Sequence, residues 1–290
     1  MGLIRRIFSH VGSGSSSGNY YSSMNNALLR LNNVYTMLHY PMFRSEGDSF
    51  LDAQTNLTDY CMSLLPSVKG KMLLEVGCGN GVQANYILEK YTPEFMKAID
   101  LNAGNIEIAR QEAQMKGITR VEFSVDDAHL LDTVADNSVD FLINIESAFH
   151  YPQKDAFFSQ IQRVLKPGGS FLIADILTKK SRKSRMIGRW RNRMSYHHWP
   201  IESYRNALPG ANFIALKFSD ITSEVIRGFK LYRRWLREMD KRHFLEDLAL
   251  KIYYTIHVNL NIYLLRTRRQ YCVIVGQKPH ARSQAHSPGL

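Results

Sequence analysis

Cysteine is scarce in this sequence, with Cys61, Cys78 and Cys272 widely separated along a chain of 290 residues. Three separated cysteines exclude a disulfide framework and a cysteine-rich zinc site, so we predict reduced thiols, no bound metal and a cytoplasmic location. Long apolar runs are also missing, because the most apolar stretch, 248–265, contains Lys251, a histidine and two asparagines. That stretch is too polar for a membrane span, and the first eight residues lack the apolar core of a signal peptide.

Acidic residues are scarce in the last two fifths of the chain. Residues 176–290 hold 23 Lys and Arg against 7 Asp and Glu, a net charge of +16, whereas residues 1–175 have a net charge of −5. The densest basic run spans 179–193 and contains Trp190. Such a run is compatible with a solvated face, an anionic membrane surface, an acidic carrier or phosphorylated substrate, or nucleic acid. A cytoplasmic protein that contacts a membrane peripherally is therefore an alternative to one that is only cytoplasmic.

Three glycines, Gly77, Gly79 and Gly81, stand at alternate positions in one short stretch, 73–82. An apolar strand pattern runs into Glu75, and a helical pattern follows the third glycine at once. Glycines in such a turn leave no Cβ between the backbone and a ligand, so an adenosyl group can lie against it. The third glycine comes two positions after the second, whereas the dinucleotide fingerprint requires three, and this spacing argues against NAD.

A second acidic residue, Asp100, ends the next apolar segment, 95–99. Ligands of open α/β sheets lie beyond the carboxyl ends of the strands, so we expect Asp100 beside the glycine turn. A carboxylate there can accept both hydroxyls of a ribose. Further polar or glycine-rich groups follow at 126–128, 144–147 and 165–169, where a strand or helix is expected to end.

Short apolar runs alternate with helical patterns, which predicts an α/β fold with a parallel sheet. We expect strands near 72–76, 95–100, 120–125, 139–145, 170–175, 212–218 and 271–277. We expect helices near 24–37, 49–65, 81–90, 103–116, 129–132, 153–165 and 201–207, and a long helical region over 223–265.

This ordered set of motifs resembles the class I S-adenosylmethionine-dependent methyltransferases. The matching features are the E-x-G-x-G-x-G turn that begins at Glu75, the later acidic residue Asp100, and the segment L-K-P-G-G at 165–169. The resemblance covers 70–175 most fully. It implies a Rossmann-like sheet of seven strands, with the last strand antiparallel between the fifth and sixth, and S-adenosylmethionine as the cofactor.

Within this class, the segments 220–228 and 271–275 are similar to the C-terminal region of bacterial lipid and polyketide O-methyltransferases, including those acting on phthiotriol-type waxes. In those enzymes, helices between the sixth and seventh strands form a cap over the acceptor. Here the cap has apolar residues, which either face an acceptor or simply pack. They are Phe229, Leu231, Tyr232, Trp235, Leu236 and Met239.

Composition and resemblance together divide the chain into four parts. The first, 1–18, is rich in Gly and Ser toward its end and is expected to be a flexible N-terminus. A helical cover, 19–65, precedes a catalytic domain, 66–278, which includes the helical cap at about 222–268. The remaining residues, 279–290, are expected to form a disordered tail.

The resemblance assigns cofactor contacts to residues at the ends of successive strands. Glu75 would lie near the amino end of the methionine part, Asp100 at the ribose, and Asp127 with the Ala128 amide at the adenine amino group, although Asp126 leaves this register open by one. Tyr20 and His39, with Tyr21 and Tyr40, either close the pocket or pack helix against sheet. The full predicted set is Glu75, Gly77, Cys78, Gly79, Gly81, Asp100, Leu101, Asp127, Ala128, Asn144, Tyr20 and His39.

The segment that begins at Glu146 has the pattern E-S-x-x-H, which many small-molecule O-methyltransferases of this class carry beside the acceptor. We predict His150 as the general base, because a histidine with a pKa near neutrality can take a proton from a weakly nucleophilic hydroxyl. Asp175, at the end of the fifth predicted strand, would orient it. A structural role for His150 is the alternative, with His197 and His198 as second candidates for the base.

The sequence therefore predicts methyl transfer from S-adenosylmethionine to a hydroxyl of a hydrophobic small molecule or lipid, of natural-product or polyketide type. One alternative is carbon or nitrogen methylation of a prenyl, sterol-like or amine acceptor, in which Glu146 and nearby aromatic residues matter more than a base. Another is a non-catalytic membrane- or RNA-associated protein that keeps the fold. Nucleic acid is the less favoured partner, because the added binding module, N-P-P-Y motif and catalytic cysteine of RNA methyltransferases are not visible.

Overall fold

The computed structural model describes residues 17–179, 196–238 and 244–280. Residues 1–16 of the predicted flexible N-terminus, the basic run from residue 180 onward, Met239 of the cap and most of the predicted tail lie outside these residues, whereas Ser17 and Gly18 begin a helix.

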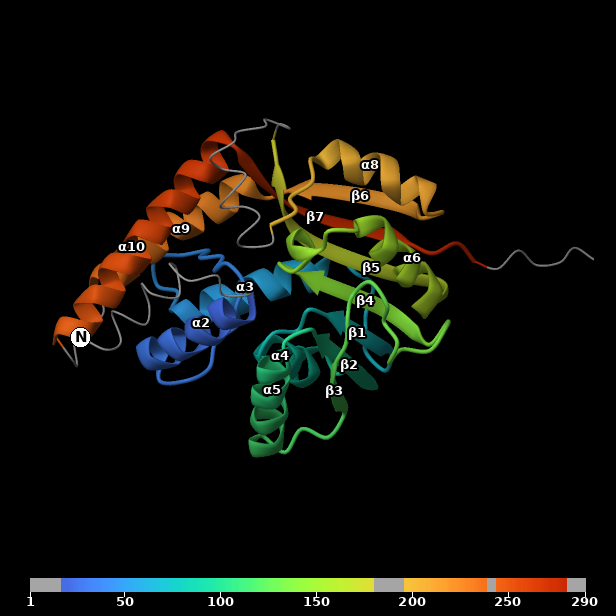
Figure 1. Ribbon diagram of the computed structural model, residues 1–290, viewed down its shortest axis with the longest axis horizontal. Coiled ribbons are helices and arrows are strands. Elements are labelled where there is room, and N and C mark those ends of the chain that lie inside the picture. Colours follow the sequence, from blue (N-terminus) through green and yellow to red (C-terminus); the bar gives the residue numbers. More distant parts are fainter. Residues whose placement is uncertain (1–16, 180–195, 239–243, 281–290) are drawn as a thin grey trace, which may run out of the picture.

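A mixed sheet of seven strands forms the centre of the described chain (Figure 1). Its strand order is β3-β2-β1-β4-β5-β7-β6; β1 to β5 pair in parallel, and β7 runs antiparallel to both β5 and β6. The predicted Rossmann-like sheet with its inserted last strand is confirmed. The strands are β1 (Met72–Val76), β2 (Phe95–Asp100), β3 (Val121–Val125), β4 (Val139–Ile145), β5 (Leu165–Thr178), β6 (Ile214–Asp220) and β7 (Arg269–Gln277).

Helices cover both faces of the sheet and bury successive side chains of its strands on opposite sides. In β1, Leu73 belongs to one apolar core and Leu74 to the other, and both are fully buried. The first core is shared with α2 (Ser17–Asn32), α3 (Phe50–Ser63), α4 (Val82–Tyr91), α5 (Ala103–Met115), α9 (Thr222–Glu238) and α10 (Phe244–Thr267). The second core is shared with α6 (Lys154–Val164) and α8 (Ile201–Gly210).

Several element boundaries differ from those predicted. The first helix ends at Asn32 instead of residue 37, and Asn33 adopts a left-handed φ of 59°. The short helix expected at 129–132 is a turn, in which the amides of Leu130 and Leu131 both donate to the Asp127 carbonyl, and Leu131 has a φ of 47°. A helix cannot continue through a non-glycine residue in that conformation without strain.

The C-terminal cap consists of α9 and α10, and α10 lies along the outer edge of the molecule (Figure 1). Phe229, Tyr232 and Leu236 of α9 are buried in the first core, so these three residues pack within the protein. Within the described residues, no helix combines the length and the hydropathy that crossing a membrane requires.

Candidate cofactor and acceptor site

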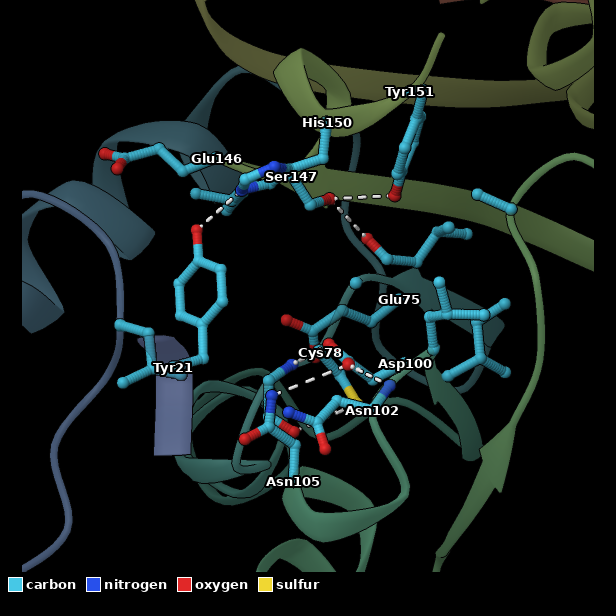
Figure 2. Close-up of a pocket in the computed structure, with 18 of the residues that line it drawn as sticks. Tyr21, Glu75, Cys78, Asp100, Asn102, Asn105, Glu146, Ser147, His150 and Tyr151 are labelled. Carbon is cyan, nitrogen blue, oxygen red and sulfur yellow. Dashed lines mark hydrogen bonds between the residues drawn. The ribbon is translucent and has the colours of Figure 1, made fainter. Parts of the chain in front are cut away.

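A cavity of about 670 Å³ opens at the carboxyl ends of β1, β2 and β4. Figure 2 shows the glycine-turn residue Cys78 and Asp100 on one side of it, and His150 on the other. Tyr21, from α2, reaches across the cavity toward His150 (Figure 2). The cavity therefore joins the turn after β1, the segment after β4 and the N-terminal cover.

The glycine turn has a tight backbone that only glycine accepts without strain. Gly77, Gly79 and Gly81 have φ values of 78°, 55° and 76°, in the left-handed region. A Cβ at Gly77 would lie 2.3 Å from the Ser147 Oγ, and one at Gly81 would lie 2.5 Å from the Ala109 Cβ. At these two positions, protein atoms fill the space that we had attributed to ligand approach. The explanation from the sequence was therefore incomplete.

Asp100 is fixed directly beside this turn, as its position at the end of β2 predicted. Its carboxylate accepts hydrogen bonds from the Gly79 amide at 2.9 Å and from the Asn102 amide at 2.8 Å. Burial raises the pKa of Asp100, while these backbone hydrogen bonds oppose the shift. The carboxylate and the glycine turn therefore form one rigid unit that lines the cavity.

Three residues that line the cavity, Glu75, Gln83 and His129, have buried polar atoms without a partner among the described residues. The Glu75 side chain is 2% exposed, and its Oε2 accepts no hydrogen bond. The Gln83 Nε2, at the start of α4, likewise donates none. Burial, and then the nearby charge of Asp100, raises the pKa of Glu75 to about 8. Since buried polar groups are normally hydrogen-bonded, an unpaired acceptor and an unpaired donor in one cavity indicate a ligand with both kinds of group.

At the far end of the cavity the structure separates the roles of two neighbouring aspartates. Asp126 accepts hydrogen bonds within its own loop, including 2.6 Å from the Thr133 Oγ1. The Asp127 Oδ1 accepts from the backbone and the ring of His129, at 2.9 and 2.6 Å. Although burial acts in the other direction, the bonds from His129 lower the pKa of Asp127. Both aspartates line the cavity together with Ala128 and Leu101, whose side chain is 71% exposed.

His150 lies on a short 3-10 turn, η1 (Ala148–His150), that follows β4. Its Nε2 is 2.7 Å from the Tyr21 hydroxyl, and the two rings meet edge to face. The ring of Tyr196 lies 5.4 Å from the histidine ring. The hydrogen bond joins residues 129 positions apart, and no pattern in the sequence singled out Tyr21 as the partner of His150.

Asp175 is fully buried beside the loop that carries His150. Its carboxylate accepts hydrogen bonds from the Tyr204 hydroxyl at 2.6 Å and from the Ile176 amide at 2.8 Å, and it also interacts with the backbone of Phe149. Lys154, which is fully buried, interacts with it electrostatically and donates to the His197 carbonyl at 2.7 Å. These contacts turn the Asp175 side chain toward α6 and α8, and its role in orienting His150 stays a prediction.

Asn144 is fully buried at the end of β4 and is not among the residues that line the cavity. Its amide donates to the Val76 carbonyl at 2.9 Å and to the Ser147 Oγ at 2.6 Å. Ser147 in turn begins the segment that carries His150. Asn144 therefore supports the cavity wall, and its contact with a cofactor stays a prediction.

Glu146 lines the cavity on the side of the cap and the N-terminal cover. It has a left-handed φ of 52°, and its Oε1 accepts hydrogen bonds from the Tyr40 amide at 2.8 Å and the Tyr271 hydroxyl at 2.9 Å. Burial raises the pKa of Glu146 to about 8. A carboxyl in this setting can hold a proton or accept a cation at neutral pH.

The remaining histidine candidates are divided between the cavity and the interior. His39 lines the cavity, and burial lowers its pKa to about 4, so its ring is neutral at pH 7. His197 lines the cavity as well, whereas His198 is absent from its lining, and burial lowers the pKa of His198 to about 3. The side chain of Tyr20 lies outside the described part of the chain.

Comparison with known proteins assigns the chain that forms this cavity to a family. A family model described as a methyltransferase domain matches residues 67–233, which is more than half of the chain. The chain belongs to the methyltransferase domain family. The predicted resemblance is thereby confirmed, and S-adenosylmethionine is the cofactor of such methyltransferases.

Two curated relatives of this methyltransferase-family chain have names that describe lipid acceptors. It is 31% identical over 176 residues to the probable phthiotriol/phenolphthiotriol dimycocerosates methyltransferase 2 of Mycobacterium ulcerans, covering 61% of this chain and 59% of that protein. It is 32% identical over 163 residues to the fatty-acid O-methyltransferase of Mycolicibacterium smegmatis, covering 56% and 51%. The chain thus spans between half and three fifths of the length of these relatives.

A solved methyltransferase structure has the same fold as this methyltransferase-family chain. It is phosphoethanolamine N-methyltransferase 2 of Haemonchus contortus, with a TM-score of 0.76 and 18% identity, covering 90% of this chain and 58% of that one. The likeness extends beyond the residues that the family model matches. At this identity it supports the fold and carries no information on the acceptor.

Proposed function

We propose that this methyltransferase transfers a methyl group from S-adenosylmethionine to a hydroxyl of a lipid or hydrophobic small molecule, with His150 as the general base. The observation that carries this proposal is the 2.7 Å contact between the His150 Nε2 and a hydroxyl, that of Tyr21, inside the cavity that the glycine turn lines. A ring nitrogen that already meets one hydroxyl there is placed to accept a proton from another.

The cavity residues fit S-adenosylmethionine at each of its polar ends. The unpaired Glu75 carboxyl would accept from the ammonium group, and the unpaired Gln83 amide would donate to the carboxylate of the methionine part. Asp100, fixed by the Gly79 amide, would accept from the ribose hydroxyls. The adenine would lie against Leu101, beside Asp127 and the Ala128 amide. Two of these contacts, those of Glu75 and Gln83, would use atoms that have no partner among the described residues.

When bound, the cofactor supplies an activated methyl group on a sulfonium, so the protein has to position and desolvate the acceptor and remove its proton. His150 would hold the acceptor hydroxyl at Nε2, in the place that the Tyr21 hydroxyl occupies in this structure. Because Tyr21 lies on α2, this helix of the N-terminal cover has to move its Tyr21 hydroxyl away from His150 when the acceptor enters. The covered cavity would then exclude water from the reacting atoms.

A lipid-like acceptor is supported by the names of the two curated relatives, one a phthiotriol methyltransferase and the other a fatty-acid O-methyltransferase. Both names describe acceptors with long apolar parts. An acidic carrier or an anionic membrane, contacted through the basic run 179–193, would present such an acceptor. Residues 180–193 lie outside the described chain, so this part of the proposal is based on their charge alone.

Nitrogen or carbon methylation is the second candidate, and one feature of the cavity favours it. Glu146 lines the same cavity, and Tyr40 and Tyr271 both donate to its Oε1. A carboxylate with nearby aromatic rings stabilises a cationic amine or a carbocation.

Substitution of His150 and Glu146 separates these candidates. For hydroxyl methylation, we expect His150→Ala to lower kcat by about 10²- to 10⁴-fold, the range for loss of a general base, with unchanged affinity for S-adenosylmethionine. Glu146→Gln should then retain most of the turnover. Near-full turnover of His150→Ala together with a large loss in Glu146→Gln would support the second candidate and exclude the first. Cofactor binding without any methylated product, in all variants and with all acceptors, would indicate a non-catalytic protein.

A further inference from the structure

The helix α10 has an apolar face that no described residue covers. Ile252, Ile256, Leu260 and Tyr263 are 53%, 60%, 43% and 54% exposed. Their spacing of four, four and three residues places them on one side of the helix. The buried residues of α10, Val258, Ile262 and Leu265, lie on the opposite side and pack against the first core. We call the four exposed residues the outer stripe of α10.

Basic side chains flank the outer stripe. Arg233 of α9 is exposed and donates to the Asn259 Oδ1 at 3.2 Å, which places a guanidinium group at the middle of α10. Arg266 and Arg268 are exposed at the end of α10. Lys179 is also exposed, and its Nζ donates to the Leu265 carbonyl at 2.9 Å, so the basic run 179–193 begins at this end of the helix.

Acidic residues are absent from the same stretch of sequence. Between Lys251 and Gln277, the chain contains no Asp or Glu. The acidic residues of α10, Glu246 and Asp247, precede the outer stripe in the sequence. An exposed apolar stripe with basic flanks can contact an anionic bilayer, because the apolar side chains are buried and the basic groups are attracted to the headgroups. Scattered single apolar residues would need no such explanation, but four residues aligned along three turns of one helix do.

We infer that the outer stripe of α10 docks on an anionic lipid bilayer, with its apolar side chains among the acyl chains and its basic flanks at the headgroups. The helix is also connected to the cavity. On another side of α10, Asn261 accepts from the Tyr40 hydroxyl at 3.0 Å, and the Tyr40 amide donates to Glu146. A bilayer held at α10 would therefore lie next to the cover through which an acceptor has to enter. Docking itself does not depend on which reaction the protein catalyses.

Co-sedimentation of the full-length protein with vesicles tests this inference. The vesicles contain either phosphatidylcholine alone or phosphatidylcholine and phosphatidylglycerol at a ratio of about 7:3. We expect binding to the anionic vesicles that weakens as NaCl is raised from roughly 0.1 to 0.5 M, because salt screens the basic flanks. Ile256→Ser should weaken binding by about tenfold, since burial of a half-exposed isoleucine is lost. Arg266→Gln should weaken it by about fivefold.

Met115→Ser is the matched control, because Met115 is 73% exposed on α5, away from the outer stripe. It should bind vesicles as the wild type does, and every variant should bind S-adenosylmethionine normally, which reports an intact fold. Equal binding by Ile256→Ser and the wild type, or no vesicle binding by the wild type, would overturn the inference. So would a wild-type dimer that Ile256→Ser converts to a monomer while neither binds vesicles, because the stripe would then be a subunit interface.

Discussion

The unpaired carboxyl of Glu75 should make cofactor binding dependent on proton release. Among the described residues its Oε2 is buried without a partner, and its pKa is raised to about 8 by burial and by Asp100. If the ammonium group of S-adenosylmethionine binds there, its positive charge favours the carboxylate, and the carboxyl should lose its proton on binding. Binding should therefore release a proton at neutral pH, and Glu75→Gln should abolish this release.

The size of the effect follows from the two pKa values. With a pKa of about 8, roughly nine tenths of the Glu75 side chains carry a proton at pH 7. An α-amino group with a pKa of about 7.8 is already mostly charged at that pH and takes up little. The wild type should thus release roughly 0.8 proton for each cofactor bound. In Glu75→Gln the release should be close to zero, and the affinity at pH 8 should fall by about 10- to 100-fold, as for loss of a hydrogen bond to a charged group.

Isothermal titration calorimetry measures this release directly, when the same titration is run at pH 7 in two buffers that differ in ionisation enthalpy. The difference in apparent enthalpy gives the number of protons released. Glu89→Gln is a matched control, because Glu89 lies on the far end of α4 from the cavity and does not line it. A wild type that binds without releasing a proton, or a Glu75→Gln variant that releases as much as the wild type, would refute the assignment of Glu75.

The same carboxyl should lower the stability of the ligand-free protein as the pH rises. Its pKa is raised from 4.5 to about 8 in the folded state, so between these values the folded protein holds a proton that the unfolded chain has lost. This contribution to stability is present at low pH and is lost as the pH rises through about 8. It amounts to a change on the order of 4 kcal/mol. Glu75→Gln does not titrate, so its Tm advantage over the wild type should grow from pH 5 to pH 8, and a constant difference would contradict the raised pKa.

Two further predictions concern the framework of the cavity. Gly77→Ala should destabilise the protein by about 1–3 kcal/mol more than Gly70→Ala, as measured by urea unfolding. Both glycines have a positive φ, but only a Cβ at Gly77 would lie 2.3 Å from the Ser147 Oγ. Equal losses of stability would exclude this contact as the cause. Lys154→Met should cost about 3–5 kcal/mol because it leaves Asp175 buried without its countercharge. Adding Asp175→Asn should recover part of this loss, and strictly additive effects in the double variant would show that the two groups do not interact.

The strands and the glycine turn were predictable from the sequence because their signals are local. Apolar runs of strand length, glycines at alternate positions and Asp100 at the end of a run all lie within 72–100. A parallel sheet then brings neighbouring strand ends together, and the Gly79 amide indeed meets Asp100 at 2.9 Å. Local pattern and general topology were sufficient for this half of the cavity.

The acceptor half was less predictable, because its contacts join distant segments. The position of Tyr21 at His150 depends on how α2 crosses the sheet, and the sequence predicted this helix to begin and end several residues later. The contact of Asp175 with Tyr204 was not foreseen, because it depends on how α8 packs against β5. Lys154 is fully buried and interacts electrostatically with Asp175. No pattern in a single sequence predicts that a lysine is buried beside this aspartate.

Methyl transfer to oxygen is the central claim, and incubation with trideuteromethyl-labelled S-adenosylmethionine tests it most directly. The purified protein is given a total lipid extract and the labelled cofactor, and labelled products are identified by mass spectrometry. We predict a product labelled on an oxygen of an apolar molecule with the wild type, and almost none with a His150→Ala variant that still binds the cofactor. Label on nitrogen or carbon, or equal labelling by the variant, would contradict the account.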